Sequence, residues 1–184
     1  MMDAIQIATS VAAALERGGI PHMFVGSFAR NFHAFARSTN DLDIVVSMDR
    51  HGLERFLAEL GPDFGVEPQG TFETNTGTLR HTVVHRQSAF QVEVFLLSND
   101  PFDHERFRRR LPIDFNGHRT FVLTAEDVVV SKLRWSRPKD LEDVRDVLSI
   151  QAAAMDWDYL HHWTGLHGTR ARLDELRASI PPMD

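Results

Sequence analysis

The sequence predicts a mixed α/β (α+β) fold, in which helices flank a small mixed β-sheet and a helical region follows. Short apolar runs at 22–25 and 41–47 are typical of strands, and a helical pattern separates them. Two further runs, 79–86 and 90–97, alternate as strands do and are close enough to form a hairpin. Strands and helices interspersed in this way are typical of a sheet covered by helices.

The first elements follow from periodicity. Apolar residues recur at helical spacing over 3–17, which predicts a helix that ends at the glycine pair 18–19. A strand over 22–25 follows, and an apolar and aromatic segment then predicts a second helix over 28–36. We expect its phenylalanines to belong to the core: Phe28, Phe32 and Phe35.

Turn residues divide the rest of the chain. A helix is predicted from about 49 to 60, with loops and turns over 61–78 before the hairpin. The remaining predicted elements are a helix over 102–110, strands near 111–115 and 118–122 joined by Asn116-Gly117, and helices that begin at Thr124, at Pro138 and at about 156.

Composition narrows the class of protein. The 184 residues predict one domain or one with a small helical appendage, and we expect a core over 1–123 with a helical region over 124–184 packed on it. A net charge of −6 argues against non-specific nucleic-acid binding as the main role. The absence of cysteine excludes disulfides and thiolate metal sites. With no membrane-length apolar run and no basic leader, we expect a cytoplasmic protein without a membrane partner.

The candidate site lies in the stretch 24–46. Asp41 and Asp43 are two residues apart on a predicted strand, so their side chains project from the same face. Paired carboxylates repel each other unless a cation lies between them, and hard oxygen ligands favour magnesium. Upstream, Gly26 allows close approach of a ligand, and Ser27 lies near a helix N-terminus, where free N–H groups suit a phosphate. The combination indicates chemistry on a nucleoside triphosphate.

Glu93 is the third carboxylate of interest. It is a single acid in an otherwise apolar strand, where a charge is costly unless it is paired, hydrogen-bonded or bound to a metal. Glu93 is therefore a candidate third ligand. The alternative is a strand whose glutamate face is open to solvent.

The motifs resemble the signature of the nucleotidyltransferase superfamily related to DNA polymerase β. The resemblance is carried by Gly26-Ser27, by Asp41-Leu42-Asp43-Ile44 after thirteen intervening residues, and by the run Arg37, Thr39, Asp41, Asp43. It implies a nucleotidyltransferase fold over about 20–150, with Asp41 and Asp43 holding two magnesium ions. It also implies that Gly26 and Ser27 contact the triphosphate, and that Glu93 shares a metal and can activate the attacking hydroxyl.

A second group of motifs lies downstream. Ser131-Lys132-Leu133, the turn Arg137-Pro138-Lys139-Asp140, and Asp143 resemble C-terminal motifs of AbiEii-type toxins and related small bacterial nucleotidyltransferases. This resemblance implies that Lys132 binds the triphosphate, a role that suits a compact point charge. Arg37 and Asp140 are further candidates for nucleotide binding. For Lys139 and Asp140, a structural ion pair is the alternative.

The predicted reaction is transfer of a nucleoside monophosphate from a nucleoside triphosphate to a hydroxyl, with release of pyrophosphate. The acceptor stays open between the 3′ end of tRNA, a small molecule and a protein hydroxyl. The run 106–110 (RFRRR) is either a basic rim for tRNA or a solvated face. The resemblance also implies a toxin paired with an antitoxin protein. The alternative class is a module on the same scaffold that binds a nucleotide or a protein without catalysis.

Overall fold

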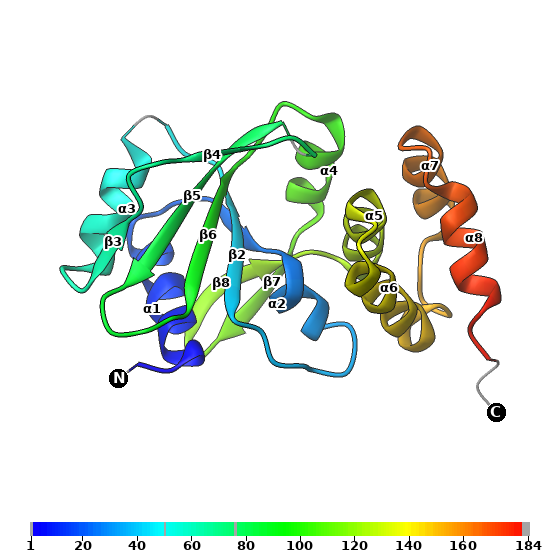
Figure 1. Ribbon diagram of the computed structural model, residues 1–184, viewed down its shortest axis with the longest axis horizontal. Coiled ribbons are helices and arrows are strands. Elements are labelled where there is room, and N and C mark those ends of the chain that lie inside the picture. Colours follow the sequence, from blue (N-terminus) through cyan, green and yellow to red (C-terminus); the bar gives the residue numbers. More distant parts are fainter. Residues whose placement is uncertain (1, 50, 76, 182–184) are drawn as a thin grey trace.

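The computed structural model in Figure 1 describes residues 2–49, 51–75 and 77–181. Within these residues the elements are, in order, α1 (Ala4–Arg17), β1 (His22–Phe24), α2 (Gly26–Asn31), β2 (Asp41–Val46), α3 (Gly52–Leu60), β3 (Phe64–Val66), β4 (Thr71–Glu73), β5 (Thr78–His85), β6 (Gln91–Leu96), α4 (Pro101–Arg109), β7 (Leu111–Phe115), β8 (His118–Val122), α5 (Ala125–Trp135), α6 (Pro138–Gln151), α7 (Trp157–Leu166) and α8 (Arg170–Ala178).

The strands form one mixed sheet in the order β3-β5-β6-β2-β1-β8-β7, and β4 also pairs with β5. Strand β2 lies between β1, which is antiparallel to it, and β6, which is parallel. The predicted hairpins β5–β6 and β7–β8 are both antiparallel. In the second, Asn116 and Gly117 have φ of 52° and 83°, as a tight hairpin turn requires. The predicted mixed α/β fold is confirmed.

Alternation along β2 separates the core from the candidate site. Leu42 and Ile44 are fully buried on one face, and each such side chain stabilises the fold by about 1.5–3 kcal/mol. Asp41 and Asp43 lie on the other face and are only partly buried. Helix α1 adds a fully buried face to the core: Ile7, Ala8, Val11, Ala12 and Ala14.

Two short strands lie where the sequence predicts only loops and turns. β3 and β4 have three residues each, too few for an alternating pattern to be recognised. Both pair with β5 in antiparallel register. Pairing with a distant segment, and not the local sequence, therefore makes them strands.

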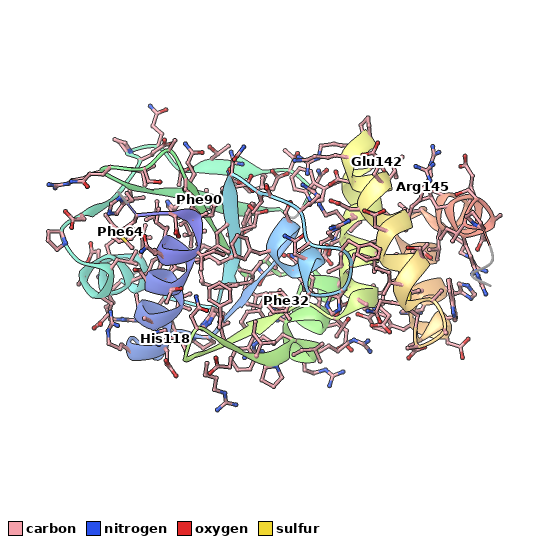
Figure 2. The ribbon with its side chains drawn as sticks, turned by 90° about the horizontal axis from the view of Figure 1, so that it is seen from below. Phe32, Phe64, Phe90, His118, Glu142 and Arg145 are labelled. Carbon is pink, nitrogen blue, oxygen red and sulfur yellow. The ribbon has the colours of Figure 1, made fainter. Side chains whose placement is uncertain are left out.

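Helix α2 ends at Asn31 instead of near residue 36. The Asn31 side chain donates to the Arg37 carbonyl oxygen at 2.8 Å and accepts from the Arg37 N–H at 3.2 Å, which turns the chain into a loop. Phe28 is 8% exposed, but Phe32, labelled beside α2 in Figure 2, is 45% exposed and Phe35 is 79% exposed. The expectation of three core phenylalanines is thus wrong for Phe32 and Phe35.

After β8, every element in the described residues is a helix. Thr124 caps α5 by accepting from the Asp127 N–H, and Pro138 lies in the first turn of α6, as predicted. Figure 1 shows α5 and α6 next to the sheet, with α7 and α8 farther out. The predicted division at 123/124 stays a prediction, and residues 182–184 lie outside the described part.

Within the described residues, no helix has the length and apolar character needed to cross a membrane.

Candidate active site

Strands β2 and β6 bring the three predicted acids together. Their parallel register pairs Asp43 with Glu93 and Asp41 with Gln91. Residues paired across neighbouring strands point to the same face of a sheet, so Glu93 lies directly beside Asp43. The Thr39 hydroxyl donates to Asp41 Oδ1 at 2.6 Å and fixes that carboxylate at the start of β2.

The turn between β1 and α2 meets Asp43 at Gly26. Gly26 has a φ of 58°, in the left-handed region that favours glycine. A Cβ at this position would lie 1.9 Å from Asp43 Oδ2. Both the backbone conformation and the close approach therefore require glycine. The Val25 N–H also donates to the Asp43 carbonyl at 2.9 Å, which ties the turn to β2.

A cleft of about 180 Å³ opens over these acids. Six of the predicted site residues line it: Gly26, Ser27, Asp41, Asp43, Glu93 and Lys132. Other cationic side chains face the same space: Arg80, Arg106, Arg137 and Lys139. A cleft with both carboxylates and cations suits a ligand that combines a metal ion with an anion, as a metal–nucleotide does.

Asp43 has a strongly perturbed environment. Its pKa is raised from the ordinary value to about 7, mainly by burial. The charges of Asp41 and Glu93 and a hydrogen bond with Glu93 raise the pKa further, whereas Lys132 lowers it. Near neutral pH, a proton on Asp43 thus reduces its repulsion with Asp41 and Glu93. A bound cation would reduce the same repulsion.

The three acids fit a divalent cation by their chemistry, since carboxylate oxygens are hard ligands. In their present positions, however, the three acids do not form a metal site. Arg80 Nη1 donates to both Glu93 carboxylate oxygens, at 3.0 and 3.1 Å. In the described part of the chain, no group of three or more His, Cys, Asp or Glu side chains is arranged to hold a metal ion. In this geometry Glu93 is paired with Arg80.

A buried ionic network backs the cleft on the side of α5 and α6. Lys132 Nζ lies 3.0 Å from Asp140 Oδ1 and 2.8 Å from Asp143 Oδ2. Asp143 also accepts from Arg37 Nη2 at 2.9 Å, and it lies 3.2 Å from Arg30 Nε. Burial alone would raise the pKa of both aspartates. Hydrogen bonds from Arg137 and Lys132 hold the pKa of Asp140 below its ordinary value, and those from Arg37 and Lys132 do the same for Asp143. The aspartates are therefore ionised and fix the position of Lys132.

Arg37 and Asp140, the other two candidates for nucleotide binding, do not line this cleft. The Arg37 guanidinium binds Asp143, and its Nη2 lies 3.4 Å from Ser27 Oγ. Asp140 is fully buried and pairs with Lys132 and Arg137. The ion pair of Asp140 with Lys139, which was the structural alternative, is therefore wrong in its partner. Nucleotide binding by Arg37 and Asp140 stays a prediction, and their contacts hold residues that line the cleft.

Side chains that line the cleft but were not assigned to the site from the sequence include Arg80, Arg106, Trp135 and Arg137. Arg80 reaches the site through the hairpin register. The hairpin register pairs Thr82 with Glu93 and Arg80 with Phe95, so Arg80 is diagonal to Glu93 on the same face. For the others, the relevant neighbours are set by how α4 and α5 pack, which the sequence does not reveal.

The arginine run 106–110 is neither a basic rim nor a purely solvated face. Arg106 is buried and lies 2.8 Å from Asp103, and Arg108 pairs with Glu105 at 2.7 Å. The Arg109 guanidinium lies 3.7 Å from the Tyr159 ring centroid, and that of Arg110 lies 4.2 Å from the Phe107 ring centroid. Three of these contacts lie within α4 and its C-cap, and the contact of Arg109 with Tyr159 joins α4 to α7.

The fold is that of nucleotidyltransferases. The solution structure of the antibiotic-resistance factor ANT(2″)-Ia is similar, with a TM-score of 0.61 and 11% identity over 93% of this chain and 94% of that chain. ANT(2″)-Ia in complex with adenylyl-2″-tobramycin gives 0.58 and 12% over 91% and 98%. An antigenic nucleotidyltransferase-like protein from Paracoccidioides brasiliensis gives 0.55 and 17% over 99% and 96%. At these identities the likeness shows the fold alone.

The sequence itself shows the family. Residues 16–175 match the family described as "Nucleotidyltransferase of unknown function (DUF6036)", and the chain belongs to that family. The predicted superfamily and enzyme class are therefore confirmed. Nucleotidyltransferases generally use a nucleoside triphosphate with a divalent metal and transfer a nucleoside monophosphate. No curated protein matches the chain.

Proposed function

We propose that this protein is a magnesium-dependent enzyme that transfers a nucleoside monophosphate from a nucleoside triphosphate to a hydroxyl. The observation that carries this proposal is the meeting of Asp41, Asp43 and Glu93 with the Gly26 turn and Lys132 in one cleft. In the reaction, the acceptor oxygen forms a bond to the α-phosphorus, and the bond to the β-phosphate oxygen breaks. Pyrophosphate leaves, and the hydroxyl proton passes to Glu93.

The roles of the residues follow from their contacts. Asp41 and Asp43 would hold two magnesium ions, which would supply charge neutralisation at the phosphates. Gly26 and Ser27 bind the triphosphate where the chain approaches Asp43 most closely. Lys132 has three N–H donors and spends two on Asp140 and Asp143, which leaves one for an oxygen of the departing pyrophosphate.

As the acceptor we propose a small molecule with a hydroxyl. The arginine run that supported tRNA is engaged in contacts within the protein, and only Arg108 of the run's ion-paired side chains is mostly exposed, at 72%. The 3′ end of tRNA is the second candidate because Arg137 and Lys139 lie at the cleft. A toxin role would add an antitoxin protein as a partner.

A transfer assay tests the proposal. The protein would be incubated with magnesium and each of the four nucleoside triphosphates, labelled at the α-phosphate, with small hydroxyl-bearing molecules or total tRNA as separate acceptors. We expect label on a small molecule, none with a γ-label, and none with the Asp41→Ala, Asp43→Ala double variant. Label on tRNA alone would make tRNA the acceptor, and undiminished transfer by the double variant would refute the assigned site.

The inactive binding module gives a different result in the same assay. It would bind a triphosphate with no transfer to any acceptor. For the toxin role, expression of the intact protein would arrest growth, whereas the double variant would not.

A further inference from the structure

Arg80 has no role in the proposed reaction, yet it contacts one of its three acids. It projects from β5 toward Glu93 on β6, and its Nη1 donates to both oxygens of that carboxylate. Both side chains line the cleft and are partly buried, with 28% of Arg80 and 22% of Glu93 exposed. The pair therefore forms within the site and not on the outer surface.

In the proposed reaction Glu93 binds a metal ion. In the present geometry it binds Arg80 instead. A third acid beside Asp41 and Asp43 adds to their repulsion unless a positive charge compensates it. In the present geometry, that charge is the Arg80 guanidinium. Asp43 and Glu93 are neighbours in the register, and the described residues contain no group of three acids arranged to hold a metal.

Arg80 also has a hydrogen-bond donor that is not used. Its Nε is buried and has no hydrogen-bond partner among the described residues. Arginine has five donors in a fixed fork that matches phosphate as well as carboxylate. If Glu93 turned to a metal ion, Arg80 would remain in the cleft with a free guanidinium beside the space for an anionic ligand.

We propose that Arg80 is a positioning residue that neutralises Glu93 while the site is free of metal and moves to a phosphate of the nucleotide when a metal ion takes Glu93. This inference rests on the proposed function. It makes metal binding and nucleotide binding assist each other, because the first frees the arginine that the second uses. Arg80 thereby lowers the affinity for metal alone and raises the affinity for the metal–nucleotide.

Manganese binding to the metal-free protein is the first test. Wild type, Arg80→Gln and Arg80→Lys would be titrated with Mn²⁺ without nucleotide, together with Lys139→Gln. Lys139 is a matched control because it lines the same cleft and has no carboxylate partner among the described residues. We expect Arg80→Gln to bind Mn²⁺ about two- to fivefold more tightly, the factor set by loss of a modest ion pair. We expect little change for Arg80→Lys and for Lys139→Gln.

Nucleotide binding is the second test. With saturating magnesium, Arg80→Gln is expected to bind the preferred nucleoside triphosphate about fivefold or more weakly, as loss of a charge-assisted hydrogen bond implies. Its thermal transition in EDTA should fall and recover with Mn²⁺. Arg80→Lys, which keeps the charge, guards against a fold defect in the glutamine variant.

Opposite changes in the two affinities support the inference, because a merely structural role would weaken both. Unchanged or weaker Mn²⁺ binding by Arg80→Gln would overturn it and leave the proposed function intact. Equal tightening by Lys139→Gln would also overturn it, because general charge would then be the cause. If the wild type showed no metal-dependent nucleotide binding, the proposed function and this inference would fail together.

Discussion

Gly26 is held to glycine by two independent constraints, its φ of 58° and the position of Asp43 Oδ2, 1.9 Å from where a Cβ would lie. The first constraint belongs to the backbone and the second to the site. A substitution here therefore tests how closely the turn and the acid depend on each other.

Replacing Gly26 with alanine should displace the Asp43 carboxylate. We expect the variant to lose about 1–2 kcal/mol of unfolding free energy through the positive φ, and to lose nearly all transfer activity through the displaced acid. Urea unfolding and the transfer assay measure the two effects. Gly61→Ala is the control, because Gly61 also has positive φ but nothing lies within 4 Å of its Cβ position. Equal activity in the two variants would contradict the assigned contact.

Asp43 should also make the stability of the metal-free protein depend on pH. Between its ordinary pKa of 3.8 and about 7, the folded chain keeps a proton that the unfolded chain loses. The unfolded state then binds fewer protons, so the free energy of unfolding falls as pH rises, on the order of 1 kcal/mol per pH unit, and the loss is complete above the folded pKa.

Urea unfolding in EDTA between about pH 5 and pH 8 measures this slope. We expect Asp43→Asn to flatten it and to be more stable than the wild type at the upper end, because an amide carries no charge to bury. Asp146→Asn, on an exposed aspartate, should keep the slope. An identical slope in wild type and Asp43→Asn would show that the raised pKa is not that of Asp43.

At the residue scale, the sequence predicted what depends on local spacing. The acid pair and the glycine turn lie within one short stretch, and Glu93 stood out because it interrupts an apolar strand. Arg80 was missed because its importance depends on the register of β5 against β6. The pKa of Asp43 likewise depends on burial, which arises only in the folded chain.

At the scale of elements, charged side chains join α5 and α6 to α2. Lys132 of α5, Asp143 of α6 and Arg30 of α2 meet in a buried cluster, with 3% of Asp143 and 2% of Arg30 exposed. Each ion in such a cluster depends on its partners, because an unpaired buried charge is costly.

Asp143→Asn tests this junction. Loss of the carboxylate would leave Arg30 and Lys132 short of a counter-charge, so we expect unfolding free energy to fall by about 3–5 kcal/mol. Urea unfolding gives the value. Asp146→Asn is the matched control on the same helix, since its carboxylate is 52% exposed and also pairs with Arg30; its loss should cost about 0–1 kcal/mol. Similar values for the two variants would argue against the buried network.

The sequence predicted the longer elements well and the shorter ones poorly. Capping at Thr124 and Pro138 in the first turn of α6 are local signals, and both are confirmed. The ends of α2 and the existence of β3 and β4 depend on contacts with other segments, such as the Asn31–Arg37 hydrogen bonds and the pairing with β5.

At the scale of the whole molecule, we propose that the helical region 124–184 is packed on the core 1–123 and is required by it. Val128, Val129 and Leu133 of α5 are fully buried, and α5 contacts α2. A protein cut at residue 123 would expose these contacts and lose Lys132.

A fragment of residues 1–123 should therefore fail to fold cooperatively. Circular dichroism with urea unfolding would show a broad transition or none, and magnesium-dependent nucleotide binding would be absent. A control fragment of residues 1–151, which restores α5 and α6, should recover part of the cooperativity. A cooperative transition in the shorter fragment would mean that the helical region is an independent appendage.

The fold class was accessible from the sequence because its strands and helices follow one another in a regular pattern, whereas the cleft was not. Its walls come from the helices α2, α4, α5 and α6 and from the strands β2, β4, β5 and β6. The distance between Lys132 and Asp143, for example, depends on how α5 and α6 pack against each other.

The most direct test of the account is acceptor-independent. Calorimetric titration of the protein with each nucleoside triphosphate, with magnesium and with EDTA, would compare the wild type with the Asp41→Asn, Asp43→Asn double variant. We predict magnesium-dependent binding of at least one triphosphate by the wild type, and loss of the magnesium dependence in the variant although it remains folded. Equal binding by both proteins, or binding that EDTA does not affect, would contradict the claim that these two acids form the metal–nucleotide site.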